Sequence, residues 1–284
     1  MSFENLSPEK ITDLPINEAV PQIFNKGLVY VAPSTPIRNV ALFLIPIRNL
    51  FMGGIVVMEE GKPIGKIGPK HILKKILDAG YPQCMDIDAK NVMVSIEQEI
   101  RTNFIIREVL ELFLKTRFGF SPIMKDGQLV ATISTRDFLP IIAKMNINMP
   151  LQTIASDLIY ISDKISVENT LQIMFKKNLR KIAIKDGDGV KIVDDRSLLG
   201  FLFSGGRGNP KALDIDIGFL PKSNVAELEP NTSISKAAEI LLKEDLPCSI
   251  FNDRIVTPWD LVMKVLGTYV NRTDMNETNL LDSF

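Results

Sequence analysis

A short pattern that recurs four times constrains this chain more than any other feature. The pattern is a pair of apolar strands joined by a tight polar turn and followed at once by a residue that favours a helix N-terminus. The turns are Glu60-Gly61, Asp126-Gly127, Asp186-Gly187-Asp188-Gly189 and Asn252-Asp253. Gly, Asn and Asp tolerate the positive φ that a two-residue hairpin turn requires. The sequence therefore predicts four β-hairpins.

A helix is expected on each side of every hairpin. Before each hairpin, apolar residues recur near every 3.6 positions, which is typical of an amphipathic helix. These helices are predicted to start at Ile37, Ile106, Val167 and Ile234. The residues after the hairpins, Gly68, Ser134, Asp194 and Thr257, all belong to the set that caps helix N-termini. With one strand ahead of the first helix, the repeat is β-α-β-β-α, and the fold class is α/β (α+β).

Each repeat is too small to bury its sheet well alone, so we expect the repeats to pack as two pairs. Module 1 is predicted at residues 24–145, with repeats one and two at about 24–78 and 89–145. Module 2 is predicted at residues 151–266, with repeats three and four at about 151–203 and 222–266. Residues 1–22 are expected to form an N-terminal extension, and the polar residues 271–284 a mobile tail.

Composition excludes several classes of function. Lys and Arg number 33 against 34 Asp and Glu, which gives a net charge of −1. Such a balance provides no field for holding nucleic acid, which is not expected as a partner. The chain shows no signal-like start and no long apolar run, so we expect a cytoplasmic protein without membrane contact.

Familiar catalytic and metal-binding patterns are missing from the sequence. The two cysteines are far apart, and His71 is the one histidine, so no metal site is predicted. No serine or cysteine nucleophile with a partnering base can be assembled either. We therefore expect the chain not to be an enzyme.

At this point the chain resembles tandem cystathionine β-synthase (CBS) domains arranged as two Bateman modules. Two hairpin-to-helix segments carry the resemblance, Ile133-Ser134-Thr135-Arg136-Asp137 and Val256-Thr257-Pro258-Trp259-Asp260, together with Leu179-Arg180-Lys181-Ile182. The resemblance implies four repeats packed as two pseudo-twofold modules. It also implies a non-catalytic regulatory or sensor protein that binds an adenosine-containing ligand in clefts between paired repeats.

Ligands and partners follow from the resemblance alone. The family binds AMP, ADP, ATP or S-adenosylmethionine as regulatory ligands, and no obligatory cofactor is implied. The regulated partner protein is unidentified, and pairing of two chains into a homodimer through these modules is a further arrangement that the resemblance allows. An interaction scaffold with vestigial ligand sites is the alternative function.

Two hydroxyl–carboxylate pairs, Ser134 with Asp137 and Thr257 with Asp260, are the first candidate contacts for a nucleotide. A helix N-terminus and its hydroxyl suit a phosphate, and the carboxylate one turn later can accept both ribose hydroxyls. The same pair can instead close a capping box, in which the acid bonds to its own backbone. Repeats one and three keep a capping residue but carry His71 and Ser197 in place of the acid, which favours the nucleotide interpretation.

Three basic residues complete the candidate site. Family members often carry a basic residue near the position of Arg180 and Lys181, where it reaches the phosphates, and Arg136 could do the same in module 1. An exposed charge that faces water is the simpler alternative for all three. Gly68 offers no hydroxyl and Asp194 would repel a phosphate, so we predict at most one strong site per module. Trp259 is expected at the interface between modules.

Overall fold

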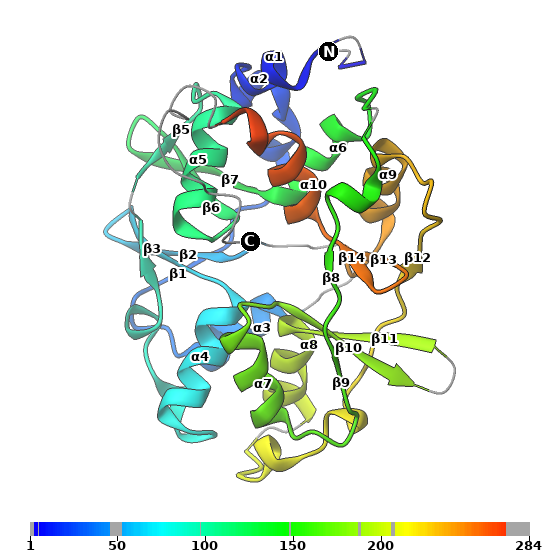
Figure 1. Ribbon diagram of the computed structural model, residues 1–284. Helices are drawn as coiled ribbons and strands as arrows, with labels where there is room; N and C mark the ends of the chain where they lie inside the picture. Colours follow the sequence, from blue (N-terminus) through cyan, green and yellow to red (C-terminus); the bar gives the residue numbers. More distant parts are fainter. Residues whose placement is uncertain are drawn as a thin grey trace, which may run out of the picture.

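The computed structural model describes residues 3–4, 6–45, 53–96, 98–147, 149–186, 189–205 and 208–270. The predicted β-α-β-β-α repeat is confirmed in all four copies (Figure 1). The first helices begin at the four predicted residues, and the second helices are capped at the four predicted positions. Residues 187–188 of the third predicted turn and the predicted mobile tail, 271–284, lie outside the described residues.

Module 1 follows a short N-terminal helical segment. That segment contains α1 (Pro8–Thr12), α2 (Ile16–Ala19) and the 3-10 turn η1 (Pro21–Asn25). Repeat one contains β1 (Tyr30–Val31), α3 (Ile37–Leu44), β2 (Ile55–Glu59), β3 (Lys62–Ile67) and α4 (Pro69–Ala79). Repeat two contains β4 (Val94–Ser95), β5 (Ile100–Arg101), α5 (Ile106–Thr116), β6 (Phe120–Lys125), β7 (Gln128–Ser134), the 3-10 turn η4 (Thr135–Phe138) and α6 (Leu139–Ile142).

Module 2 has the same β-α-β-β-α order in each repeat, but its additional short strand opens the first repeat of the module and not the second. Repeat three contains β8 (Ser156–Asp157), β9 (Tyr160–Ile161), α7 (Val167–Lys176), β10 (Lys181–Asp186), β11 (Gly189–Asp194) and α8 (Asp195–Gly200). Repeat four contains β12 (Ala226–Glu227), α9 (Ile234–Lys243), β13 (Ser249–Phe251), β14 (Arg254–Val256) and α10 (Pro258–Val265).

In each module, a short strand of one repeat pairs with the hairpin of the other repeat. Within each repeat the strand before the first helix pairs in parallel with the first hairpin strand, as β1 does with β2 and β9 with β10. The segment that opens repeat two crosses over, so that β4 pairs with β3 of repeat one. In the same way β8, which opens repeat three, pairs with β14 of repeat four. The hairpins of one module are therefore tied together by backbone hydrogen bonds.

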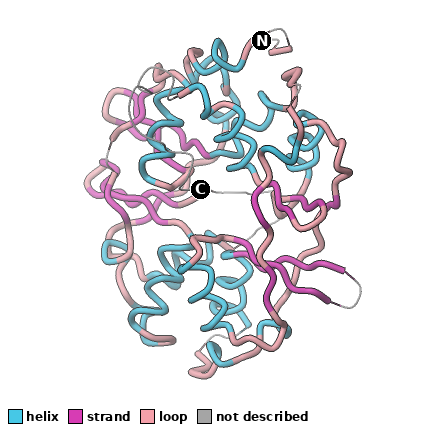
Figure 2. The backbone as a smooth tube through the Cα atoms, in the orientation of Figure 1, coloured by secondary structure: helices cyan, strands magenta, loops and turns pink. Residues whose placement is uncertain are grey.

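The helices form two layers that join the modules. One apolar core contains residues of α5, α6, α9 and α10, so it joins repeats two and four, and the N-terminal helices pack on it. A second core contains residues of α3, α4, α7 and α8 and joins repeats one and three. Figure 2 shows these layers at the two ends of the molecule with the strands between them. The hairpin-to-helix junctions consequently point to the middle of the molecule.

Within the described part of the chain, no helix has the length and apolar character that crossing a membrane requires.

Candidate functional site

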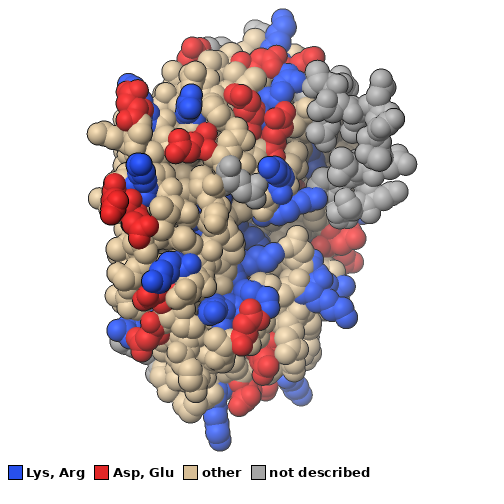
Figure 3. Space-filling view, turned by 90° about the vertical axis from the view of Figure 1, so that its left-hand side faces the viewer, with Lys and Arg blue, Asp and Glu red and all other residues tan. Residues whose placement is uncertain are grey.

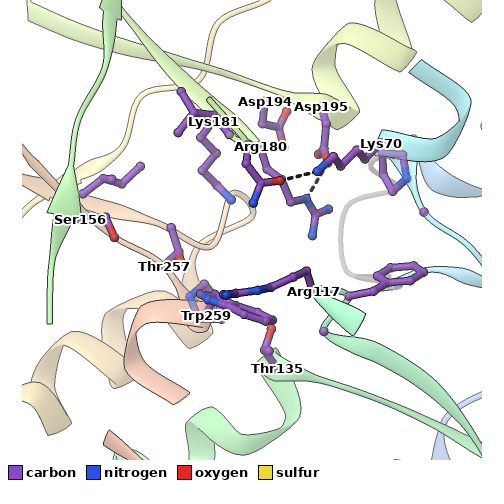
Figure 4. Close-up of a pocket in the computed structure, with 18 of the residues that line it drawn as sticks. Lys70, Arg117, Thr135, Ser156, Arg180, Lys181, Asp194, Asp195, Thr257 and Trp259 are labelled. Carbon is purple, nitrogen blue, oxygen red and sulfur yellow. Dashed lines mark hydrogen bonds and ion pairs between the residues drawn. The ribbon is translucent and has the colours of Figure 1, made fainter. Parts of the chain in front are cut away.

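A cavity of about 530 Å³ lies at the centre of the molecule, and all four repeats contribute to it. The four hairpin-to-helix junctions meet there, since Gly68, Thr135, Asp194 and Thr257 all line it. Figure 4 shows residues of repeat three on one side and residues of repeats two and four on the opposite side. Segments that are widely separated in sequence thus form a single site.

The polar lining of the cavity is richer in cations than in anions. Its basic residues are Lys70, Lys74, Arg117, Arg180, Lys181 and Arg196, and its acidic residues are Asp157, Asp194, Asp195 and Asp260. On the face drawn in Figure 3, Lys and Arg side chains gather around a hollow near the middle of the molecule. The excess of positive charge suits an anionic ligand.

Burial and neighbouring positive charges lower the pKa values of two basic residues at this site. Burial, followed by the charges of Lys70, Arg180 and Lys66, lowers the pKa of His71 to about 4. Burial, followed by the charge of Arg180, also lowers the pKa of Lys70. Nearby positive charges disfavour further protonation, and a bound anion would relieve that effect.

Arg180 is held in place by an ion pair. Its Nε donates to Asp195 Oδ2 at 2.7 Å, and Asp195 is only 5% exposed whereas Arg180 is 46% exposed. Burial alone would raise the pKa of the Asp195 carboxyl, but the charge and hydrogen bond of Arg180 outweigh it and hold that pKa below its usual value. Lys181 follows directly at the start of β10 and lines the same cavity. The structure thus brings these two predicted residues to one wall.

Thr257 and Asp260 lie on the cavity at the start of α10. Asp260 Oδ2 accepts hydrogen bonds from the Thr257 backbone N–H at 2.9 Å and from Thr257 Oγ1 at 2.6 Å. Its other oxygen, Oδ1, accepts from Ser156 Oγ at 2.6 Å and lies 3.6 Å from Lys264 Nζ. The acid therefore closes a capping box and still presents a second oxygen beside the cavity.

Ser134 and Asp137 also close a capping box, but both are outside the lining of the cavity. Asp137 Oδ2 accepts from the Ser134 backbone N–H at 2.8 Å and from Ser134 Oγ at 2.9 Å. Asp137 Oδ1 forms an ion pair with Lys26, which directly follows η1. Both pairs named by the sequence thus have the capping geometry, and only the pair in module 2 faces the cavity.

Repeats one and three cap their second helices with other residues. In repeat one, His71 Nδ1 accepts the Gly68 N–H at 2.9 Å, so a neutral imidazole takes the position of the carboxylate. In repeat three the roles are reversed, because Asp194 Oδ1 accepts from the Ser197 N–H at 2.8 Å and from Ser197 Oγ at 2.5 Å. The cap is kept in all four repeats while its chemistry changes.

The Arg136 side chain points to a different part of the fold. Its Nη2 donates to the carbonyl oxygens of Leu242 and Glu244, both at 3.1 Å, at the C-terminal end of α9. Arg136 does not line the cavity. In this arrangement it joins repeats two and four, and a contact with a ligand phosphate would require these hydrogen bonds to break.

Replacing Arg136 with methionine is expected to lower the free energy of unfolding by about 1–2 kcal/mol, because two backbone acceptors lose a charged donor. Urea unfolding of the variant and the parent chain measures the difference. An unchanged stability together with weaker nucleotide binding would instead place Arg136 at a ligand.

Several residues of the site escape sequence reasoning. Arg117 and Trp259 lie on the side of the cavity opposite Arg180 and Lys181 (Figure 4). Trp259 comes from repeat four and approaches Gly119 of repeat two, so it lies between modules as predicted. The sequence places Lys70 in a basic cluster with Lys62, Lys66, Lys74 and Lys75, for which a solvated helix face is the simpler interpretation and a polyphosphate site or a partner's acidic surface the alternative. No local pattern points to Ser156 or Arg117, because only the convergence of the repeats brings them to the cavity.

Comparisons with known proteins agree with this architecture. A family model for the CBS domain matches residues 20–78. A search of curated proteins found no match. Among solved structures, one similar chain is a protein of Methanocaldococcus jannaschii proposed to be an archaeal homologue of g-AMPK, at 18% identity with a TM-score of 0.71. Another is an uncharacterized conserved protein of Pyrococcus horikoshii, at 13% identity with a TM-score of 0.52. Each alignment covers 84% of this chain and 96% of the other.

Proposed function

Since the chain contains a CBS domain and has the fold of four tandem CBS domains in two Bateman modules, we propose that it is a regulatory protein that binds an adenosine-containing anion in the central cavity. The observation that carries this proposal is the composition of the cavity. A carboxylate, apolar side chains and a cluster of cations line the same space.

The parts of an adenine nucleotide match three parts of this lining. Leu158, Pro247 and Ile255 offer apolar surface for a base. Asp260 Oδ1 offers an acceptor for ribose hydroxyls, which would replace the Ser156 hydroxyl there. Arg180, Lys181 and Lys70 offer positive charge for phosphates. A cavity of about 530 Å³ is within the usual range for small-molecule sites.

The charge of the cavity favours nucleotides over S-adenosylmethionine. The sulfonium of S-adenosylmethionine is a cation, and here it would lie among side chains that already lower the pKa of Lys70 and His71. The negative charge of phosphates would instead be attracted by these side chains. We therefore propose AMP, ADP or ATP as the ligand class.

Regulation requires that the ligand favour one arrangement of the modules over another. The cavity lies where all four repeats meet, so a ligand there contacts both modules at once. Closure of the modules around the anion would give the necessary difference in affinity between two arrangements. An unidentified partner protein would then respond to that closure.

A thermal-shift screen tests the proposal. ATP, ADP or AMP at 100 times its Kd is expected to add about 2.7 kcal/mol to the stability of the chain, which raises the melting temperature by several degrees. S-adenosylmethionine at the same concentration is expected to give a much smaller shift. No shift with any adenine nucleotide would contradict the proposal and favour the scaffold function, whose sites are vestigial.

A further inference from the structure

The two modules can be compared position by position, because the strand register aligns them. Tyr30 pairs with Val56 in repeat one, and Tyr160 pairs with Ala183 in repeat three. Counting from these pairs, Lys26 in module 1 corresponds to Ser156 in module 2. The same register sets Gly53 and Gly54 against Arg180 and Lys181.

The partner repeats align in the same way. Ser121 pairs with Ile133 in repeat two, and Ser249 pairs with Val256 in repeat four. Phe120 therefore corresponds to Cys248, and Asp137 corresponds to Asp260. Each module thus serves as an internal control for the other.

The two equivalent aspartates have different partners on the same oxygen. Asp260 Oδ1 accepts from the neutral hydroxyl of Ser156. Asp137 Oδ1 instead forms an ion pair with the ammonium of Lys26, and the side-chain amide of Gln22 donates to the Asp137 carbonyl at 3.3 Å. Because Asp137 is buried, its charge is compensated from within the chain. A ribose diol would have to displace the directly bonded ammonium of Lys26 there. In module 2 it would have to displace the Ser156 hydroxyl, while the ammonium of Lys264 lies farther from the same oxygen, at 3.6 Å.

An aromatic ring occupies module 1 where module 2 has cations. A Cβ built on Gly54 would lie 2.7 Å from Phe120 Cδ1, and one built on Gly53 would lie 2.9 Å from Phe120 Cδ2. The backbone of Gly53 and Gly54 therefore lies so close to the Phe120 ring that a side chain at either position would require the ring to shift. Arg180 and Lys181 fit at the equivalent positions, because the smaller Cys248 stands where Phe120 does in module 1.

We propose that the chain binds a single adenosine-containing ligand, at Asp260 in module 2, because its own Lys26 and Phe120 occupy the equivalent site in module 1. This inference rests on the proposed function. It narrows the prediction of at most one strong site per module to one site per chain, and it assigns Lys26 as the internal occupant of the other site.

Isothermal titration of the full chain with ATP tests the inference through matched variants. The expected stoichiometry of the parent chain is one. Asp260→Asn is expected to weaken binding by about 10- to 100-fold, since a charge-assisted hydrogen bond to the ligand is lost. Asp137→Asn is expected to leave the affinity within about threefold. Ser156→Lys, which copies the arrangement of module 1, is expected to abolish binding.

Three results would overturn the inference: a stoichiometry of two, equal weakening by both aspartate variants, or unaltered binding by Ser156→Lys. A stability measurement without ligand tests the role of Lys26 independently of the proposed function. Lys26→Ser leaves Asp137 buried without its cation, so the melting temperature is expected to fall by about 3–8 °C. If the melting temperature of Lys26→Ser equals that of the parent chain, the role of Lys26 is wrong, whether or not the parent chain binds ATP. If the melting temperature falls as expected but the parent chain binds no ATP, the proposed function is wrong.

Discussion

Replacing Arg180 with leucine is expected to lower the free energy of unfolding by about 2–4 kcal/mol. Breaking a buried ion pair from one side costs about 3–5 kcal/mol, and the partial exposure of Arg180 reduces that figure. The stability is lost because the buried Asp195 carboxylate would no longer have the directly bonded guanidinium of Arg180 to compensate its charge. Urea unfolding at pH 7 measures the change.

Lys181→Leu is the matched control for this experiment. Lys181 is the next residue and lines the same cavity, but the ion pair with Asp195 belongs to Arg180. Its replacement is expected to change stability by less than about 0.5 kcal/mol, while ATP affinity is expected to fall in both variants. Equal stability of the two variants would show that the ion pair does not stabilise the fold.

Acid is expected to destabilise the protein through His71. The imidazole has a pKa of about 4 in the folded chain against about 6.5 when unfolded, so between these values the unfolded state binds more protons. The contribution of His71 to stability is therefore complete above pH 6.5 and is lost as the pH falls from 6.5 to 4. A pKa difference of this size corresponds to roughly 3 kcal/mol.

The measurement is urea unfolding at several pH values, with His71→Asn as the control. An asparagine side chain can still accept the Gly68 N–H, but it does not titrate. The parent chain is expected to lose more stability than the variant between pH 6.5 and 4. Parallel pH profiles would show that the imidazole is not the group responsible.

Local patterns were enough to predict the helices and hairpins of the four repeats, but not the short crossing strands β4 and β8. The starts at Ile37, Ile106, Val167 and Ile234 and the four capping positions all lie in the structure where the sequence places them. Apolar periodicity, turn residues and caps act over a few neighbouring residues, so they can be recognised without knowledge of the packing.

The site depends on contacts that local patterns do not contain. Lys26 reaches Asp137 across 111 residues, and Arg136 reaches Leu242 across 106. The aspartates of the two motifs look alike in sequence, and the structure distinguishes them by what contacts Oδ1. Which of them faces the cavity follows from how the repeats pack. Two differences in the chain, Lys26 against Ser156 and Phe120 against Cys248, distinguish the two sites.

The pairing of β8 with β14 connects the module 2 site to the backbone of both repeats of that module. Ser156 contacts Asp260 through its side chain, and through its backbone it belongs to β8, which pairs with β14 of repeat four. In the sequence, β8 follows shortly after residues 146–150, which connect one module to the other. A ribose that displaced the Ser156 hydroxyl would thus change the contacts of a strand close to the connection between the modules. Ligand binding at Asp260 would in this way affect how the two modules are joined.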